Sequence, residues 1–328
     1  RDYYGWGTPT YYSDFTGGIT LNQGSLQLAD TYGFGAGTVT LNSGRVSSDS
    51  TSGRSFFNSL VFGGDMLLGS ATKSGAMYNY GAVSLGGATR VLTTDSDFSF
   101  AGVVSNGGFT KTGTATLILS GTNTYAGATT LNTGWIRLDN NSAFGTSAVT
   151  LNAGRVSANN AGTGYTLANS FTLGGDVALG SATYWSTLTL NGGLSLGNAS
   201  RTVTFDSDVT LAGVISNGAG AGAGSLVKSG AGTVTISNAA NTFTGTLSVT
   251  AGTVRTAVGI NRLGSLAGVV ISPGAVLQLN YSETINSLTG GGSVVLNGTA
   301  VRLTTGTDNG DYVLGSVVSG TGPFTKTG

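Results

Sequence analysis

Two nested repeats organise this chain and restrict the folds that are open to it. The pentapeptide at residues 20–24 (TLNQG) returns about 20 residues later at 40–44 (TLNSG), and a similar pair occupies 130–134 and 150–154, about 110 positions further along. Repeats of this length are typical of units that cannot bury an apolar face alone and must stack on copies of themselves. The sequence therefore predicts a solenoid, which grows in one dimension and forms one continuous domain over residues 1–328.

Each short unit alternates apolar and polar side chains and ends at an asparagine–glycine turn. In one such unit Val39 and Leu41 fall on one face of an extended strand, whereas Thr38 and Thr40 fall on the other. Three strands of about five residues, joined by short corners, account for a repeat of about 20 residues. We therefore expect an all-β chain that forms a parallel β-helix, or β-solenoid, with about 20–22 residues per coil and with Leu21 directly next to Leu41 along the axis.

The repeats also divide the single domain into stretches. Two related cassettes are followed by a diverged and incomplete third, and an aromatic-rich segment precedes them. The boundaries are 1–14 for the aromatic-rich segment, 15–124 for the first cassette, 125–242 for the second cassette and 243–328 for the third.

Charge and composition exclude several classes of function. Charged residues make up 9% of the chain and 14 basic residues balance 14 acidic ones, so no field of one sign is available to attract nucleic acid or acidic lipid. Cysteine and histidine are both absent, which removes disulfides, thiolate nucleophiles, the usual zinc ligands and the ordinary general base. No apolar run approaches the roughly 18 residues of a membrane-spanning helix. We predict a protein that is not an enzyme, with no cofactor, no metal and no nucleic-acid partner.

Two arginine–aspartate pairs test the register of the coils. Arg45 and Arg155 each follow a repeat glycine, and Asp65 and Asp176 follow the equivalent glycine of the next short repeat. Each arginine should then lie one coil from an aspartate at the same corner. The sequence predicts two equivalent inter-coil ion pairs, Arg45–Asp65 and Arg155–Asp176, and the alternative is a set of unpaired, solvated charges.

Recurrence decides how the other acidic residues are interpreted. Asp95 with Asp97, and Asp206 with Asp208, occupy the same phase of the two cassettes. A catalytic site is normally unique, so we interpret both pairs as a corner motif and not as the acid–base pair of a polysaccharide-cleaving enzyme.

The recurring lysines and asparagines are also interpreted as structural. The lysines stand among threonine and glycine, which predicts exposed strand residues at a fixed corner, and the asparagines should form side-chain ladders along the rod. These residues are Lys111, Lys228 and Lys326, and Asn22, Asn42, Asn132 and Asn152.

Two windows resemble a known family of repeats. Residues 109–134 contain Lys111-x-Gly, the run TLILSG and the motif NTYAG at 123–127, and residues 228–252 contain a second copy. This pattern closely resembles the autotransporter-associated β-strand repeat, also called the passenger-associated transport repeat. The resemblance implies a right-handed parallel β-helix that is exported across the outer membrane of a Gram-negative bacterium and is displayed on the cell surface or released as an extracellular passenger.

The two ends differ from the repeats between them. Residues 324–328 (FTKTG) repeat 109–113, and 15–17 align with 125–127. The last residues thus break off inside a repeat unit, and the first residues contain the part of the unit that would come next. We expect either an excerpt of a longer solenoid or copies of this chain that stack head to tail. Aromatic side chains near the start can serve that contact, cap an end coil or form an irregular coil of a longer rod. The candidate subunit-contact residues are Tyr3, Tyr4, Trp6, Tyr11, Tyr12, Phe324 and Lys326.

Periodicity without a unique reactive cluster favours a structural function. The leading hypothesis is a non-catalytic, extracellular β-solenoid that forms a stiff surface fibre or filament by head-to-tail stacking. The alternative is the stalk or adhesin passenger of an autotransporter, which binds glycans or a host surface through the aromatic segment, the loop at 72–80 or the bulge at Tyr184 and Trp185.

Overall fold

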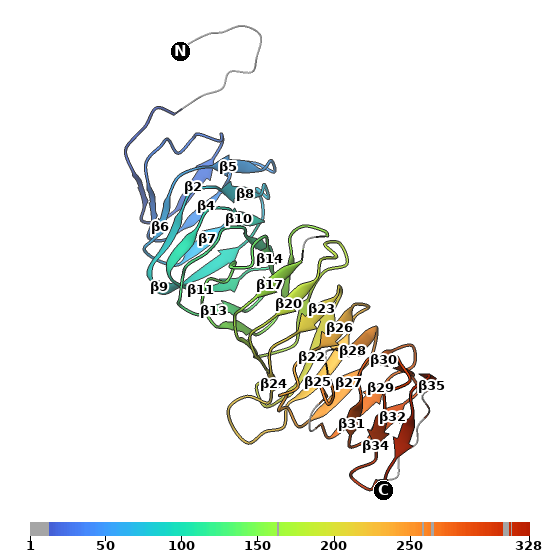
Figure 1. Ribbon diagram of the computed structural model, residues 1–328. Helices are drawn as coiled ribbons and strands as arrows, with labels where there is room; N and C mark the ends of the chain where they lie inside the picture. Colours follow the sequence, from blue (N-terminus) through green and yellow to red (C-terminus); the bar gives the residue numbers. More distant parts are fainter. Residues whose placement is uncertain (1–12, 163, 258, 264–265, 311–314, 316) are drawn as a thin grey trace, which may run out of the picture.

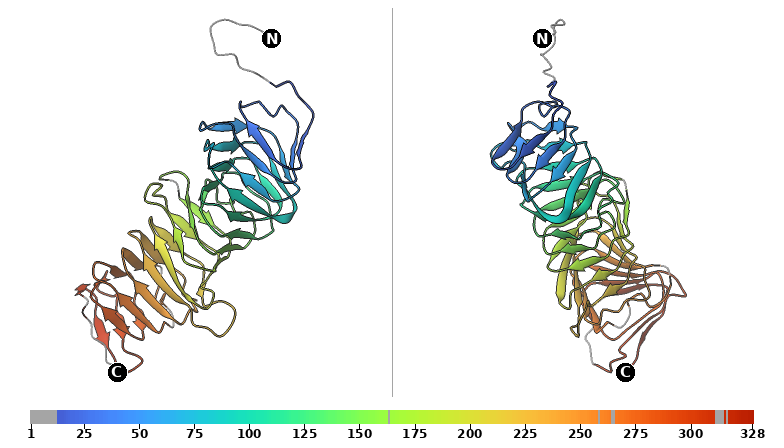
Figure 2. Two further views of the ribbon diagram at one scale, coloured as in Figure 1. Left: turned by 180° about the vertical axis from the view of Figure 1, so that it is seen from behind. Right: turned by 90° about the vertical axis from the view of Figure 1, so that its left-hand side faces the viewer.

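A computed structural model of the protein describes residues 13–162, 164–257, 259–263, 266–310, 315 and 317–328. These residues form strands, turns and irregular corners, with no helix among them, and hence no helix of a length and apolarity that would cross a membrane. The strands build an elongated rod of about 14 turns. Its first coils and its last coils, blue and red in Figure 1, lie at opposite ends, and the views in Figure 2 agree. The predicted all-β solenoid is confirmed.

All strand pairs among the described residues are parallel, and the strands stack into three long sheets and one short one. The first sheet has 13 strands, of which the last three named here join it through β9: β1 (Ile19–Leu21), β3 (Val39–Leu41), β6 (Leu60–Phe62), β9 (Val83–Thr94), β11 (Val104–Thr112), β13 (Thr129–Leu131), β15 (Val149–Leu151), β18 (Phe171–Leu173), β21 (Leu194–Ser195), β24 (Ile215–Ser216), β2 (Ser25–Leu28), β4 (Arg45–Ser48) and β7 (Met66–Leu68).

The second sheet has 12 strands and continues along the rod: β5 (Arg54–Phe56), β8 (Met77–Asn79), β10 (Phe98–Phe100), β12 (Thr116–Leu119), β14 (Trp135–Leu138), β16 (Arg155–Ala158), β19 (Val177–Leu179), β22 (Ser200–Phe205), β25 (Ser225–Ser229), β27 (Thr246–Val249), β29 (Gly268–Ile271) and β32 (Leu288–Gly290). The third, of eight strands, contains β17 (Tyr165–Leu167), β20 (Leu188–Leu190), β23 (Val209–Leu211), β26 (Thr233–Ile236), β28 (Thr253–Thr256), β30 (Val276–Leu279), β33 (Ser293–Leu296) and β35 (Val317–Gly320). The fourth is β31 (Glu283–Ile285), β34 (Leu303–Thr305) and β36 (Phe324–Lys326).

The register follows the sequence repeat but does not keep a constant period. Leu21 lies beside Leu41, as predicted, and the next residue in that column is Phe62. In the third sheet Leu277 pairs with Val294, whereas Met66 of the first sheet pairs with Leu92, so coil length varies between 17 and 26 residues. Insertions and deletions at the corners are tolerated because each strand needs only its neighbours above and below.

Inward-facing side chains of successive coils form a continuous apolar core. Phe56, Phe62, Phe98 and Phe100 are fully buried or nearly so, and edge-to-face contacts join them, with ring centroids 5.4 Å apart for the last two. Burial of each such side chain contributes about 1.5–3 kcal/mol. Since the core is renewed at each turn, the rod requires no disulfide.

The predicted asparagine ladder is present at the turn of both cassettes. Asn42 Nδ2 donates to Asn22 Oδ1 at 2.8 Å, and Asn152 Nδ2 donates to Asn132 Oδ1 at the same distance. In the following coil, a side chain at Gly63 would bring its Cβ within 2.0 Å of Asn42 Oδ1. Glycine follows the ladder because the asparagine amide already occupies the space of a side chain.

Equivalent strands of the two cassettes lie on different faces of the rod. β4 belongs to the first sheet, whereas its counterpart β16 belongs to the second, and β10 of the second sheet has its counterpart β23 in the third. By register, Leu151 lies in the column that continues β4 through β7, β9, β11 and β13, whereas its counterpart Leu41 lies in the column of β1 and β6, so a cassette is not a whole number of coils. Each cassette therefore ends one face further around the three-sided coil, and residues that repeat in the sequence point to different sides of the rod.

Candidate interaction surfaces

The two predicted ion pairs are wrong, and each arginine reaches a more distant aspartate. Arg45 Nη2 lies 2.7 Å from Asp95 Oδ2, and Arg155 Nη2 lies 2.6 Å from Asp206 Oδ2. Each guanidinium also donates to the carbonyl oxygen of a glycine in the coil between, Gly69 for Arg45. The arginine thus crosses two coils and ties three together.

Coil length explains the error. Arg45 pairs in register with Leu67 and not with Asp65, because the coil that separates them has two residues more than the repeat suggests. Asp65 falls before the strand, and its Oδ1 accepts the backbone N–H of Val91 at 2.8 Å. Asp176 does the same for Thr202, also at 2.8 Å.

The recurring lysines are not exposed, which corrects a second prediction. Lys111 has no exposed surface and lies in register between Leu92 and Leu131 of the core. Its ammonium donates to the carbonyl oxygens of Thr112 and Gly113, both at 2.8 Å, and more weakly to that of Thr133. Alternation of side chains already placed this position inward, together with Phe109.

Lys228 repeats this arrangement in the second cassette. It is fully buried, and its ammonium donates to the carbonyl oxygens of Ser229 at 3.1 Å and Gly230 at 2.6 Å. Burial lowers the pKa of Lys111 and of Lys228 from 10.5 to about 8, against the opposing charge of the nearby aspartates. Lys326 makes the same local bonds, to Thr327 and Gly328, but is exposed.

The asparagine of the family motif joins three coils. Asn123 Oδ1 accepts the backbone N–H of Val104 at 2.7 Å, and its amide donates to the carbonyl oxygen of Ala143 at 2.7 Å. Asn241 bridges Ile215 and Arg262 in the same way. The aromatic residue two positions later, Tyr125 or Phe243, is fully buried in the core. The family motif is therefore a set of internal clamps and not a binding site.

The paired aspartates are corner residues, as predicted, but the second of each pair differs between cassettes. Asp97 Oδ1 accepts the backbone N–H of Thr116 at 3.0 Å, and Asp208 Oδ1 accepts that of Thr233 at 2.9 Å. The other oxygen of Asp97 also accepts Arg137 Nη2 at 3.1 Å. Asp208 has no equivalent arginine among the described residues.

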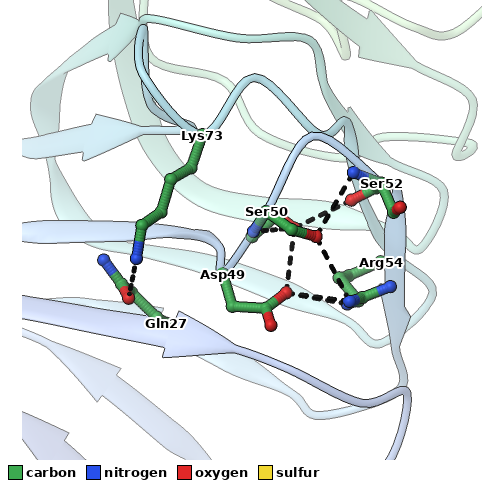
Figure 3. Close-up of polar contacts among 7 residues, drawn as sticks. Gln27, Asp49, Ser50, Ser52, Arg54 and Lys73 are labelled. Atoms are coloured by element: carbon green, nitrogen blue, oxygen red, sulfur yellow. Dashed lines mark hydrogen bonds and ion pairs between the residues drawn. The ribbon is translucent and has the colours of Figure 1, made fainter.

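A polar cluster marks the side of the first cassette (Figure 3). Arg54 donates to Asp49 Oδ1 from Nε at 3.1 Å and from Nη2 at 2.9 Å, and Lys73 Nζ donates to Gln27 Oε1 at 2.8 Å across two coils. In the second cassette the sequence positions of Gln27 and Lys73 hold Arg137 and Tyr184.

The same two-coil bridge persists in the second cassette with different chemistry. Arg137 Nη1 donates to Tyr184 Oη at 2.6 Å, and its guanidinium lies over the rings of Trp135 and Tyr184, 5.4 and 4.9 Å from their centroids. The neighbouring Trp185 is 65% exposed. The bulge singled out in the sequence thus has one ring packed on an arginine and one facing solvent.

A column of exposed aromatic rings, here called the aromatic stripe, runs along the first cassette. It consists of Tyr32, Phe57 and Tyr80, which are 40%, 56% and 51% exposed. The rings stack along the rod axis, with centroids 6.1 Å apart for the first two and 5.2 Å apart for the last two. Phe57 and Tyr80 directly follow β5 and β8, which lie side by side in Figure 1.

The aromatic stripe is specific to the first cassette. The corresponding residues of the second cassette are Ser142, Ala168 and Asn191. Beside the stripe, a hollow of about 340 Å³ is lined by Tyr32, Gly35, Ala36, Phe57 and Asn58. Sequence reasoning missed this surface because Tyr32, Phe57 and Tyr80 are spaced by coils of unequal length, so only the register brings them into one column.

The predicted end contacts are only partly described. Tyr3, Tyr4, Trp6, Tyr11 and Tyr12 lie outside the described residues. Phe324 pairs in register with Leu303 and is 38% exposed, and Lys326 is exposed in the same strand. Head-to-tail stacking through these residues stays a prediction.

One further titratable group, the carboxyl group of Glu283, is buried in the rod. Glu283 is 1% exposed, and its oxygens accept the backbone N–H groups of Arg262 and Leu263 at 2.9 and 3.1 Å. Burial raises the pKa of Glu283 to about 7. Within the described part of the chain, no three Asp or Glu side chains come together as metal ligands.

Asn123 and Asn241 lie in stretches of the chain that match a known family of repeats. The family described as passenger-associated-transport-repeat matches residues 10–28, 109–138 and 226–255. The adhesin BmaC autotransporter of Brucella suis biovar 1 (strain 1330) is 29% identical over 415 residues, an alignment that covers 99% of this chain and 12% of that protein. No solved structure matches the chain. The chain is therefore a β-solenoid that carries passenger-associated transport repeats and is similar to part of an autotransporter adhesin.

Proposed function

We propose that this chain is a non-catalytic, surface-displayed passenger segment: a stiff stalk that also contributes to adhesion through its aromatic stripe. The similarity to an autotransporter adhesin supports the class of protein, and the repeats support export as a passenger. The absence of histidine and cysteine from the sequence argues against most catalytic designs.

The aromatic stripe is the observation that carries the adhesive role. Phe57 and Tyr80 are each more than half exposed, although aromatic side chains of this size normally bury their surface. The second cassette builds the same coil with Ala168 and Asn191, so the fold does not need rings there. Exposed aromatic residues grouped in one column are characteristic of surfaces that bind a partner.

Adhesion of bacteria that display the chain tests this proposal. Relative to the unaltered chain, the double variant Phe57→Ala/Tyr80→Ala should lower adherence to host cells about ten-fold, which corresponds to about 1.4 kcal/mol. Tyr281→Ala is the matched control, because Tyr281 is 41% exposed and lies outside the stripe. Equal adherence of the double variant and the control would overturn the role of the stripe.

Head-to-tail stacking extends the proposal from a stalk to a filament. Val317 of β35 is 65% exposed and Phe324 of β36 is 38% exposed, and each of these strands pairs with a described strand on one side. An open strand edge with apolar side chains is a template for another chain. Electron microscopy of the purified protein should show rods longer than one copy, and rods of single-copy length alone would contradict stacking.

A further inference from the structure

The repeated aspartate corner exists in two forms, which we call the closed and the open corner. In the closed corner, Asp97 binds the guanidinium of Arg137, which is only 11% exposed. In the open corner, the equivalent residue Asp208 is exposed, and its carboxylate accepts one hydrogen bond among the described residues, from the N–H of Thr233. Its second oxygen has no described partner.

The arginine that could close the second corner points elsewhere. Arg255 holds the place in the second family repeat that Arg137 holds in the first, three residues after the closing glycine of each repeat. Its Nε donates to Gln278 Oε1 at 3.4 Å, in the next coil along the rod. The sequence therefore repeats the arginine, while the structure leaves Asp208 without it.

A hollow and an exposed ring replace the missing guanidinium. The hollow has a volume of about 400 Å³, and its lining includes Trp185, Asp206, Asp208 and Gly232. Gly232, preceded by Ala231, presents no bulk to fill it. Trp185 belongs to the coil that precedes Asp208 along the chain, whereas the rings around Arg137, those of Trp135 and Tyr184, belong to coils that follow Asp97. At Ser74, the residue that corresponds to Trp185, the first cassette has no ring.

The polar groups of the open corner favour a donor. Asp206 already accepts Arg155 at 2.6 Å, and the buried Ser207 donates its hydroxyl to the carbonyl oxygen of Ser186 at 3.0 Å. Lys228 is buried and turned toward backbone carbonyls. The carboxylate of Asp208 thus offers acceptor capacity in a hollow that the exposed Trp185 also lines, a combination that suits a guanidinium, which has five donors and no acceptor. A sugar hydroxyl also donates to a carboxylate, but it brings no positive charge to pair with Asp208.

We propose that the open corner binds an arginine side chain of a partner protein, with its guanidinium on Asp208 and against Trp185. The closed corner is the internal counterpart of this complex, since Asp97, Arg137 and two aromatic rings already form it within the chain. A charge-assisted hydrogen bond and a cation–π contact are the interactions that recognise the ligand. This inference adds a partner class to the proposed adhesive role, but it uses a different surface from the aromatic stripe.

Titration of the purified chain tests the proposal without cells, so its failure is distinguishable from failure of the adhesion proposal. The probes are a glycine-flanked arginine peptide and the same peptide with citrulline, a neutral isostere. The readout is the indole N–H resonance of Trp185, assigned with Trp185→Phe. The arginine peptide should shift this resonance, the citrulline peptide should not, and Asp208→Asn should weaken binding about ten-fold.

Two variants keep the test decisive. Asp97→Asn, at the closed corner, is the matched control and should leave binding to Trp185 unchanged. Arg137→Ala should free Oδ2 of Asp97 and raise the number of bound peptides from one to two. Equal shifts from citrulline and arginine, undiminished binding by Asp208→Asn in a folded protein, or a shift caused only by a neutral disaccharide would each overturn the proposal.

Discussion

The first and second cassettes share their internal clamps and differ in what they expose. Asn58 and Asn169 each donate to three carbonyl oxygens of the preceding coil, and Lys111 and Lys228 occupy the same buried corner. The aromatic stripe is present only in the first cassette, and the open corner only in the second. Repetition therefore marks structure, and departures from repetition mark the surfaces that can carry function.

The two cassettes also present their equivalent strands on different faces of the rod. Because each cassette ends one face further around the coil, an equivalent place in the two cassettes does not put two residues on one continuous surface. A rod built this way presents different surfaces in different directions. We expect the repeated internal contacts (buried lysines, asparagine clamps and ion pairs) to have equal energies in both cassettes, and three measurements test that equality.

The buried lysines should give the largest effect. Their folded pKa of about 8 lies below the ordinary 10.5, so the unfolded chain binds more protons between pH 8 and 10.5 and the free energy of unfolding should rise with pH in that window. Each lysine contributes up to about 3 kcal/mol to the rise. Urea midpoints from pH 7 to 10.5 measure it.

Paired variants separate the lysines from other groups that titrate at alkaline pH. Lys111→Met and Lys228→Met should each remove a similar part of the rise, and the double variant should remove both parts. Lys73→Met is the control, since Lys73 bonds to Gln27 near the surface. A rise unchanged by the double variant would show that these ammonium groups are not the cause.

The asparagine clamps should give the second largest effect. Asn58→Ala and Asn169→Ala each leave buried carbonyl oxygens without a donor, at a cost of about 2 kcal/mol. Hydrogen exchange of the adjoining coils measures the loss locally, which suits a rod whose repeats contact only their neighbours. Asn297→Ala, an exposed asparagine, should change little. Unequal costs at the two clamps would break the equivalence of the cassettes.

The long-range ion pairs should give the smallest effect. Their side chains are about a quarter exposed, so double-mutant cycles on Arg45 with Asp95 and on Arg155 with Asp206 should return coupling of about 0.2–1 kcal/mol. A parallel cycle on Arg45 with Asp65 should return none. Coupling in that third cycle would restore the register predicted from the sequence.

Alternating residues and turn chemistry predict most of the fold. Leu21 and Leu41 lie in one column as expected, and the asparagine ladders form at the expected turns. Both features depend on residues one short coil apart, where the sequence period and the structural period agree. The buried position of Lys111 was also encoded by alternation, but the expectation that charge is exposed concealed it.

The sequence by itself determined the parallel solenoid, its average coil length and the similarity of its repeats, because these follow from local strand and turn preferences that recur. Tertiary structure alone decided which residues meet across coils: Arg45 with Asp95, Tyr80 with Phe57, and Asp208 with no arginine. The physical reason is that corners of variable length shift the register by several residues in some coils. These shifts accumulate along the rod, and no local pattern records their sum.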